Sequence, residues 1–251
     1  MKKKKIIETP FTVQSDGSQL VGISHCAGHD KAVILCHGFK GNKMENKRLF
    51  VEAAREFAAQ HCDAFRFDFY GSGDSEGEFE ETKISINLVN LKDVYNHVAA
   101  QGYQSIALLG ISMGAATAIL AASGLDIKAL VLWSSVPDMR EVFADKMREM
   151  GEVPSTDQVV DYGGWRIRLD FMQDALQYDV KAALREIAIP KFILQGTADD
   201  PVFVHGFQEF RDIVQPPADF MEIPDAGHTY QTPNHRRQAI RQTLIWLQRN
   251  F

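Results

Sequence analysis

One stretch decides the fold of this chain: Leu108-Leu109-Gly110-Ile111-Ser112-Met113-Gly114-Ala115-Ala116. The apolar run over residues 105–109 is typical of a buried strand, and the small residues at 115–122 favour a buried helix. Between them stands a Gly-x-Ser-x-Gly pentapeptide, the pattern of a nucleophile elbow on a sharp strand-to-helix turn. Such a turn strains the backbone of Ser112, and glycines on both sides of it remove side chains that would collide. The Ser112 hydroxyl is therefore predicted to stand at the tip of a strand.

Strands and helices alternate on both sides of this stretch. Strand-like apolar segments occupy residues 11–13, 20–24, 31–36, 64–69, 127–133, 191–194 and 220–223. Helical patterns with one apolar face cover residues 46–60, 84–98 and 233–250. This alternation predicts an α/β fold with a largely parallel sheet covered on both faces, in which ligands bind beyond the carboxyl ends of the strands.

Size and composition fit a single domain over residues 1–251. Hydrophobic residues make up 45% of the chain, and the formal net charge of −6 argues against nucleic acid as a main partner. No apolar run reaches membrane-spanning length, and the four lysines at 2–5 lack the apolar segment of a signal peptide. The 3 cysteines are sparse and lack metal-type spacing, which fits a reducing cytoplasm, where we expect the protein.

One long segment, at about 139–186, interrupts the alternation. It is long for a crossover between strands and is rich in aromatic residues. We interpret it as a cap insertion that lies over the strand tips. Its candidate substrate-binding residues are Trp165, Phe171 and Tyr178, although packing inside the cap explains these residues equally well.

A serine nucleophile needs a base, and the base needs a partner that fixes its tautomer. His228 follows the strand at 220–223 in a Gly-His turn and is the candidate base, with a surface-turn histidine as the alternative. Asp199 follows the strand at 191–194 and is the candidate carboxylate. Asp200 competes for that role, and Asp199 could instead cap a following helix. The chain order serine, aspartate, histidine is the one expected on this type of sheet.

The tetrahedral intermediate of acyl transfer carries negative charge that two backbone N–H groups can bind. Met113, directly after the nucleophile, is the candidate for one donor, and Phe39, in the loop after the strand at 31–36, for the other. His37 is predicted to hold that loop by hydrogen bonding rather than to act as a base.

These motifs resemble those of the α/β-hydrolase superfamily and, within it, those of the bacterial cinnamoyl and feruloyl esterases. The resemblance rests on residues 37–43, 67–77, 110–114, 196–199 and 227–228. It implies an eight-stranded hydrolase sheet, a small cap, and a catalytic triad of Ser112, Asp199 and His228. It also implies a carboxylic-ester substrate and no cofactor, and the sequence has no residue cluster with metal-ligand spacing.

We therefore expect a serine esterase that forms an acyl-enzyme on small to medium acyl or aryl esters, hydroxycinnamoyl esters included. An aminopeptidase or an acyl thioesterase could use the same triad. An aminopeptidase would need carboxylates in the cap, for which Asp157, Asp161 and Asp170 are candidates. A non-catalytic binding protein is disfavoured because no triad member is missing. The expected partner is a small-molecule ester, and the sequence leaves open whether the chain forms a homodimer.

Overall fold

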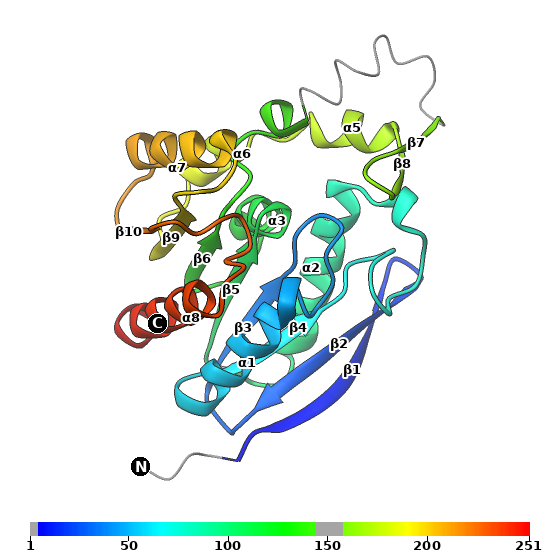
Figure 1. Ribbon diagram of the computed structural model, residues 1–251. Coiled ribbons are helices and arrows are strands. Elements are labelled where there is room, and N and C mark those ends of the chain that lie inside the picture. Colours follow the sequence, from blue (N-terminus) through cyan, green and yellow to red (C-terminus); the bar gives the residue numbers. More distant parts are fainter. Residues whose placement is uncertain (1–4, 144–157) are drawn as a thin grey trace.

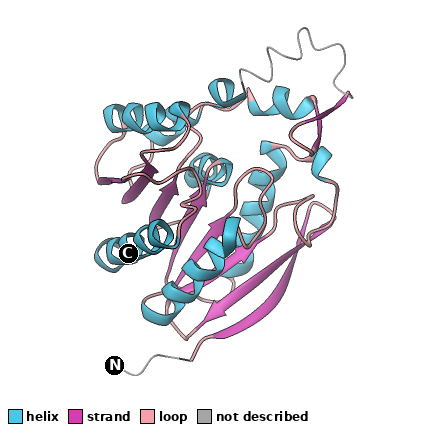
Figure 2. Cartoon of the chain, in the orientation of Figure 1, coloured by secondary structure: helices cyan, strands magenta, loops and turns pink. Residues whose placement is uncertain are grey.

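A computed structural model of the protein describes residues 5–143 and 158–251. The lysines at 2–4 and part of the predicted cap, including Asp157, lie outside the described residues. Figures 1 and 2 show a central twisted sheet with helices on both of its faces. Within the described ranges, no helix is long and apolar enough to cross a membrane.

Eight strands form one sheet in the order β1-β2-β4-β3-β5-β6-β9-β10. They are β1 (Ile7–Ser15), β2 (Ser18–Cys26), β3 (Lys31–Cys36), β4 (Asp63–Phe67), β5 (Ser105–Ile111), β6 (Ala129–Trp133), β9 (Lys191–Gly196) and β10 (Ala218–Ile223). Only β2 pairs antiparallel, with β1 and with β4, and all the other neighbours in the sheet are parallel. The predicted eight-stranded, mostly parallel sheet is therefore confirmed.

The α-helices of the described residues include α1 (Leu49–Gln60), α2 (Ile84–Ala99), α3 (Met113–Ala121), α5 (Asp170–Ala175), α6 (Val180–Arg185), α7 (Pro201–Ile213) and α8 (Pro233–Asn250). Short 3₁₀ turns are η1 (Asn46–Arg48), η2 (Phe79–Glu81) and η3 (Ala122–Gly124). A separate two-stranded hairpin consists of β7 (Val159–Asp161) and β8 (Arg166–Arg168). This hairpin lies beside α5 within the predicted cap segment (Figure 1).

Alternate residues of the central strands build two separate cores. In β3, Val33 and Leu35 pack in the core that contains α1 and α8. Ile34 and Cys36 face the other side, in the core that contains α2, α3, α6 and α7. Both faces of the strand are apolar because both faces of a parallel sheet are covered. Burial on both sides makes the sheet a rigid support for the loops at its edge.

The helix predicted over residues 46–60 begins later than expected. Its α-helical part starts at Leu49, because Lys47 and Arg48 adopt left-handed φ angles of 51° and 65°. A left-handed residue cannot continue a right-handed helix.

His25 on β2 is a fully buried histidine inside a charged cluster. Its Nε2 accepts a hydrogen bond from Arg66 Nε at 2.9 Å, and its Nδ1 lies 3.4 Å from Glu8 Oε1. Arg55 in turn binds Glu8. Burial, reinforced by the Arg66 and Arg55 charges and only partly opposed by Glu8, lowers the pKa of His25 to about 4.

We expect this lowered pKa to make the fold acid-sensitive. Between about pH 6.5 and about pH 4 the unfolded chain binds a proton at His25 that the folded chain does not, so stability falls as the pH falls through this window. The loss should be roughly 3 kcal/mol, to be measured by urea unfolding at pH 7.5 and pH 4.5. His25→Gln keeps an acceptor for Arg66 but cannot titrate, so its stability should fall less over this range. An identical fall in both proteins would contradict the assignment.

Candidate active site

Ser112 occupies the turn between β5 and α3. Its φ of 55° and ψ of −121° are strained for a residue with a side chain. Its N–H donates to the Trp133 carbonyl at 3.0 Å, which ties the turn to the end of the next strand. A Cβ on Gly114 would lie 2.1 Å from the Cys36 carbonyl oxygen and 2.3 Å from that of His37. Glycine at 114 therefore lets α3 start directly against the end of β3.

Asp199 and His228 form a hydrogen-bonded pair at the same edge of the sheet. Asp199 lies just after β9, and His228 lies in the loop between β10 and α8. His228 Nδ1 is 2.8 Å from Asp199 Oδ2 and 3.1 Å from Oδ1. Because the carboxylate only accepts, Nδ1 carries a proton, and in the neutral tautomer with this proton Nε2 is the accepting nitrogen. The Asp199 side chain is only 2% exposed, whereas that of His228 is 28% exposed, as suits a group that exchanges protons with a substrate.

Two further side chains hold this pair, and the sequence analysis singled out neither. Gln195, a buried residue of β9, donates from Nε2 to Asp199 Oδ2 at 2.7 Å. The ring of Phe203 on α7 lies 4.3 Å from that of His228. Gln195 stands in an otherwise apolar strand, so its buried amide was the one available hint of a polar role.

The structure separates the roles of the two neighbouring aspartates. Asp200 caps α7, since its side chain accepts from the Val202 N–H at 3.1 Å. The backbone N–H of Asp200 donates to Asp199 Oδ1 at 2.7 Å. Asp199 is thus the residue that lies against His228, and Asp200 faces solvent as the helix cap.

The strand register places Ser112 near this pair. Ile111 pairs with Trp133 in β6, and Trp133 pairs with Leu194 in β9. The carboxyl ends of β5, β6 and β9 therefore lie at the same edge of the sheet, and β9 extends to Gly196. Among the described residues, no hydrogen bond joins the Ser112 hydroxyl to His228 or to any other group. Nucleophile–base contacts are often loose before substrate binds.

Tyr230 ties the loop that carries His228 to the same edge. It is fully buried, and its hydroxyl donates to the Leu194 carbonyl at 3.2 Å. The Ser134 hydroxyl donates to the Tyr230 oxygen, also at 3.2 Å. Burial raises the pKa of the Tyr230 phenol. The phenol therefore stays neutral and holds the loop in place through these two hydrogen bonds.

His37 holds the loop after β3. Its Nε2 accepts from the Phe69 N–H at 3.0 Å, so the proton is on Nδ1, which donates to the Gly38 carbonyl at 2.9 Å. Burial is the main reason why the pKa of His37 is lowered. Both ring nitrogens are occupied, which matches the predicted anchoring role and leaves none for proton transfer.

The residues proposed to bind the oxyanion lie beside the nucleophile. A Cβ built on Gly38 would lie 3.2 Å from Ser112 Cβ, so the two segments touch. The Gly38 N–H already donates to Glu45 Oε1 at 2.6 Å. In the described part of the chain, the N–H groups of Phe39 and Met113 have no acceptor.

Two of the three candidate substrate-binding aromatic residues join one cluster with Phe39. Phe171 stacks on Phe39 with ring centroids 5.1 Å apart. Trp165 lies 4.6 Å from Phe79, which itself lies 5.2 Å from Phe39. Tyr178 is not brought into this cluster. Its ring is half-buried near Asp174, and burial raises the pKa of its phenol.

The cap carboxylates differ in their surroundings. Asp170 pairs with Lys83 at 2.7 Å, so its charge is compensated. Asp161 is exposed and accepts from the Gly164 N–H at 3.2 Å. Among the described residues, no group of three or more His, Cys, Asp or Glu side chains could hold a metal ion.

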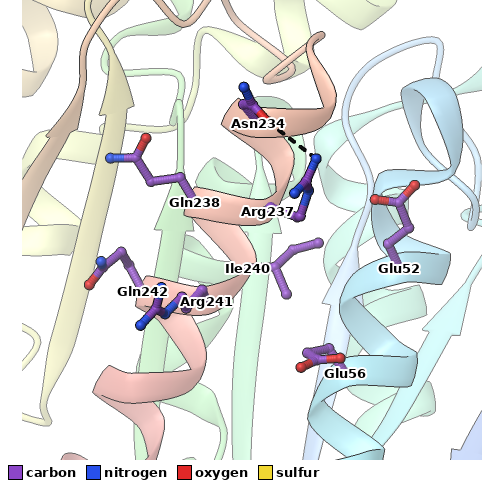
Figure 3. A pocket seen from close by; sticks show the side chains of 8 residues that line it. All are labelled: Glu52, Glu56, Asn234, Arg237, Gln238, Ile240, Arg241 and Gln242. Carbon is purple, nitrogen blue, oxygen red and sulfur yellow. Dashed lines mark hydrogen bonds between the residues drawn. The ribbon is translucent and has the colours of Figure 1, made fainter.

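A wide hollow of about 820 Å³ lies elsewhere, between α1 and α8 (Figure 3). Its lining is mainly charged and polar, and Arg237 donates to Asn234 Oδ1 at 3.2 Å across its rim. It contains no serine, and no histidine paired with a carboxylate. None of the candidate catalytic residues lines this hollow.

Comparison with known proteins gives the family. A model described as the alpha/beta hydrolase family matches residues 33–242. The chain belongs to this family.

Two solved structures share the fold over almost the whole chain. Est1E from Butyrivibrio proteoclasticus, solved with ferulic acid bound, superposes with a TM-score of 0.82 at 20% identity and covers 96% of this chain and 98% of that chain. The esterase domain of a Rhodothermus marinus protein gives a TM-score of 0.76 at 19% identity, covering 97% and 98%. At such identities the likeness concerns the fold.

A carboxylesterase of Bacillus subtilis (strain 168) is 32% identical over 104 residues. The match spans 41% of this chain and 41% of that protein, so it covers less than half the length of the curated relative.

Proposed function

We propose that the protein is a serine hydrolase of carboxylic esters. The observation that carries the proposal is the Asp199–His228 hydrogen bond at 2.8 Å, formed at the sheet edge where Ser112 occupies a strained elbow. A neutral imidazole with its proton fixed on Nδ1 offers Nε2 to a serine hydroxyl, which is the arrangement that nucleophilic acyl transfer needs.

The reaction would run through an acyl-enzyme. Ser112 Oγ attacks the ester carbonyl carbon while its proton passes to His228 Nε2. The N–H groups of Phe39 and Met113 bind the oxyanion of the tetrahedral intermediate. When the intermediate collapses, His228 gives the proton to the departing alcohol. Water then loses a proton to His228 and attacks the acyl carbon. When this second intermediate collapses, His228 returns the proton to Ser112 Oγ and the acid is released.

The substrate class follows from the aromatic cluster. An aromatic cluster lies beside the elbow and consists of Phe39, Phe79, Trp165 and Phe171. Such an apolar surface favours small to medium acyl or aryl esters. The segment 139–186 would act as the cap over this site. Est1E binds ferulic acid, which supports testing hydroxycinnamoyl esters. We also propose that the protein works in the cytoplasm, where its free Cys26, Cys36 and Cys62 would remain reduced.

A fluorophosphonate probe tests the proposal directly. The purified protein should gain the mass of one phosphonyl group, with the adduct on the peptide that contains Ser112. The probe reacts with serines activated by a neighbouring base, so an ordinary serine gives no adduct. An unchanged protein mass after prolonged incubation would overturn the proposal.

Substrate comparison separates the related chemistries. Turnover of matched aryl esters, acyl thioesters and aminoacyl anilides should rank the esters first. An aminopeptidase needs a free carboxylate for the substrate amine, and the compensation of Asp170 by Lys83 disfavours that role. Preference for the anilide or the thioester would assign the triad to the corresponding alternative.

A further inference from the structure

A small buried cavity adjoins the proposed oxyanion hole. Its volume is about 10 Å³, which is room for about one water-sized group. Its lining includes Phe39 and Met113, the two proposed oxyanion donors. The aromatic rings of Phe69 and Phe79 supply apolar wall.

Three buried polar side chains also line this cavity. Ser72, Thr82 and Asn87 are only 5%, 4% and 7% exposed. Asn87 Oδ1 is buried and has no hydrogen-bond partner. Among the described residues, the hydroxyls of Ser72 and Thr82 make no hydrogen bond, but unlike Asn87 Oδ1 they are not fully buried atoms. Burying a polar group without a partner costs about 1–3 kcal/mol, so the Asn87 oxygen is expected to bind a hydrogen-bond donor.

The other polar residues of the cavity are already engaged. Both ring nitrogens of His37 are used within the loop. The Lys40 ammonium lies 5.0 Å over the ring of Tyr162. The unused capacity of the three buried side chains is neutral: an amide oxygen that accepts, and hydroxyls that both donate and accept. A hydroxyl group matches this set, because it can donate to Asn87 Oδ1 and accept from a neighbour.

The position of the cavity indicates which part of the substrate enters it. The departing alcohol takes its proton from His228, so it leaves on that side. Neither His228 nor Asp199 lines the cavity, whereas Phe39 and Met113 do. The acyl group remains attached to the enzyme until the second step, and a cavity beside the proposed oxyanion donors suits the part that stays.

We propose that Ser72, Thr82 and Asn87 form a subsite for a hydroxyl on the acyl group, so that the preferred substrates are hydroxyacyl esters. This inference rests on the proposed esterase function. The hydroxyl would stand within a few bonds of the scissile carbonyl, because the cavity borders the oxyanion hole directly.

The test compares esters that differ only in the hydroxyl. Wild-type kcat/KM for ethyl 2-hydroxybutyrate or ethyl 3-hydroxybutyrate should exceed that for ethyl butyrate by about tenfold or more. Ethyl 3-methoxybutyrate cannot donate to Asn87 and should gain nothing. A hydroxyl on the alcohol side, in 2-hydroxyethyl butyrate, should give no preference over ethyl butyrate.

Variants of the subsite should remove this preference. In Asn87→Leu, the ratio of kcat/KM between hydroxylated and plain ester should fall to about one. Thr82→Val is nearly isosteric and should lower the ratio in the same direction, which keeps the test valid if Asn87→Leu does not fold. Thr243→Val removes a buried hydroxyl of α8 that binds Trp133 on the other face of the sheet, so it should leave the ratio unchanged.

The outcomes separate the two proposals. Equal turnover of hydroxylated and plain esters by the wild type would overturn the subsite while leaving the esterase intact. A preference that survives in both Asn87→Leu and Thr82→Val would overturn it too, as would a preference for the hydroxyl on the alcohol. Failure of every ester, together with absence of a fluorophosphonate adduct, would instead overturn the proposed function.

Discussion

Ser112→Ala is expected to lower kcat for ester hydrolysis by about a million-fold, leaving only the slow reaction that the remaining site supports. The substitution removes the atom that attacks the carbonyl, and neither His228 nor a bound water can replace it. The fold should survive, because the Ser112 hydroxyl makes no hydrogen bond within the described residues. Alanine also has a Cβ, so the backbone strain at a φ of 55° should be the same in both proteins.

The measurement is steady-state turnover of an aryl ester by the purified variant, with circular dichroism and thermal unfolding as checks of structure. Ser123→Ala is the matched control, since it removes an exposed serine of η3, directly after α3. The control should keep wild-type turnover. Retention of more than about one part in a hundred of the activity by Ser112→Ala would exclude this serine as the nucleophile.

Asp199→Asn should lower kcat by about ten-thousand-fold at neutral pH. The carboxylate accepts from His228 Nδ1, from Gln195 Nε2 and from the Asp200 N–H. An asparagine has one oxygen for these three donors, so its NH₂ group must face at least one of them. When it faces His228, the imidazole is forced into the other tautomer, and Nε2 can no longer take the serine proton.

Asp200→Asn is the matched control for this variant. Asparagine caps a helix about as well as aspartate, so α7 and activity should both be preserved to within about threefold. Equal losses in Asp199→Asn and Asp200→Asn would mean that the effect comes from the loop rather than from the histidine partner.

The elbow and the sheet could be predicted because their signals are local. Gly110, Ser112 and Gly114 stand together in the sequence, and the strand before them is uniformly apolar. The structure adds the reason for Gly114, which lies against two carbonyl oxygens at the end of β3. That contact joins residues nearly eighty positions apart, and no local pattern reports it.

Other features depend on contacts that a single sequence does not reveal. In the sequence Gln195 is only a polar residue near the end of a strand. Its hydrogen bond to Asp199 forms because the chain turns after β9. Ser72, Thr82 and Asn87 come from a glycine-rich loop, the end of a 3₁₀ turn and a helix, and only packing brings them to one cavity. The sequence alone also could not show that Phe171 packs against Phe39 and that Tyr178 does not, because both are aromatic residues of the same predicted cap segment.

The position of the His228 loop near the end of the chain has a consequence for the order in which the candidate site is synthesised. The Asp199 carboxylate accepts hydrogen bonds from Gln195 and from the Asp200 N–H, which are close to it in the sequence. The His228 imidazole comes from a later segment, which Tyr230 anchors to the ends of β6 and β9. A nascent polypeptide synthesised only as far as β9 and the turn after it would contain the proposed nucleophile, Ser112, and the Asp199 carboxylate, but not the proposed base, His228. In the proposed mechanism the serine is therefore activated only after the segment beyond β10 has been made, so shorter chains should lack esterase activity.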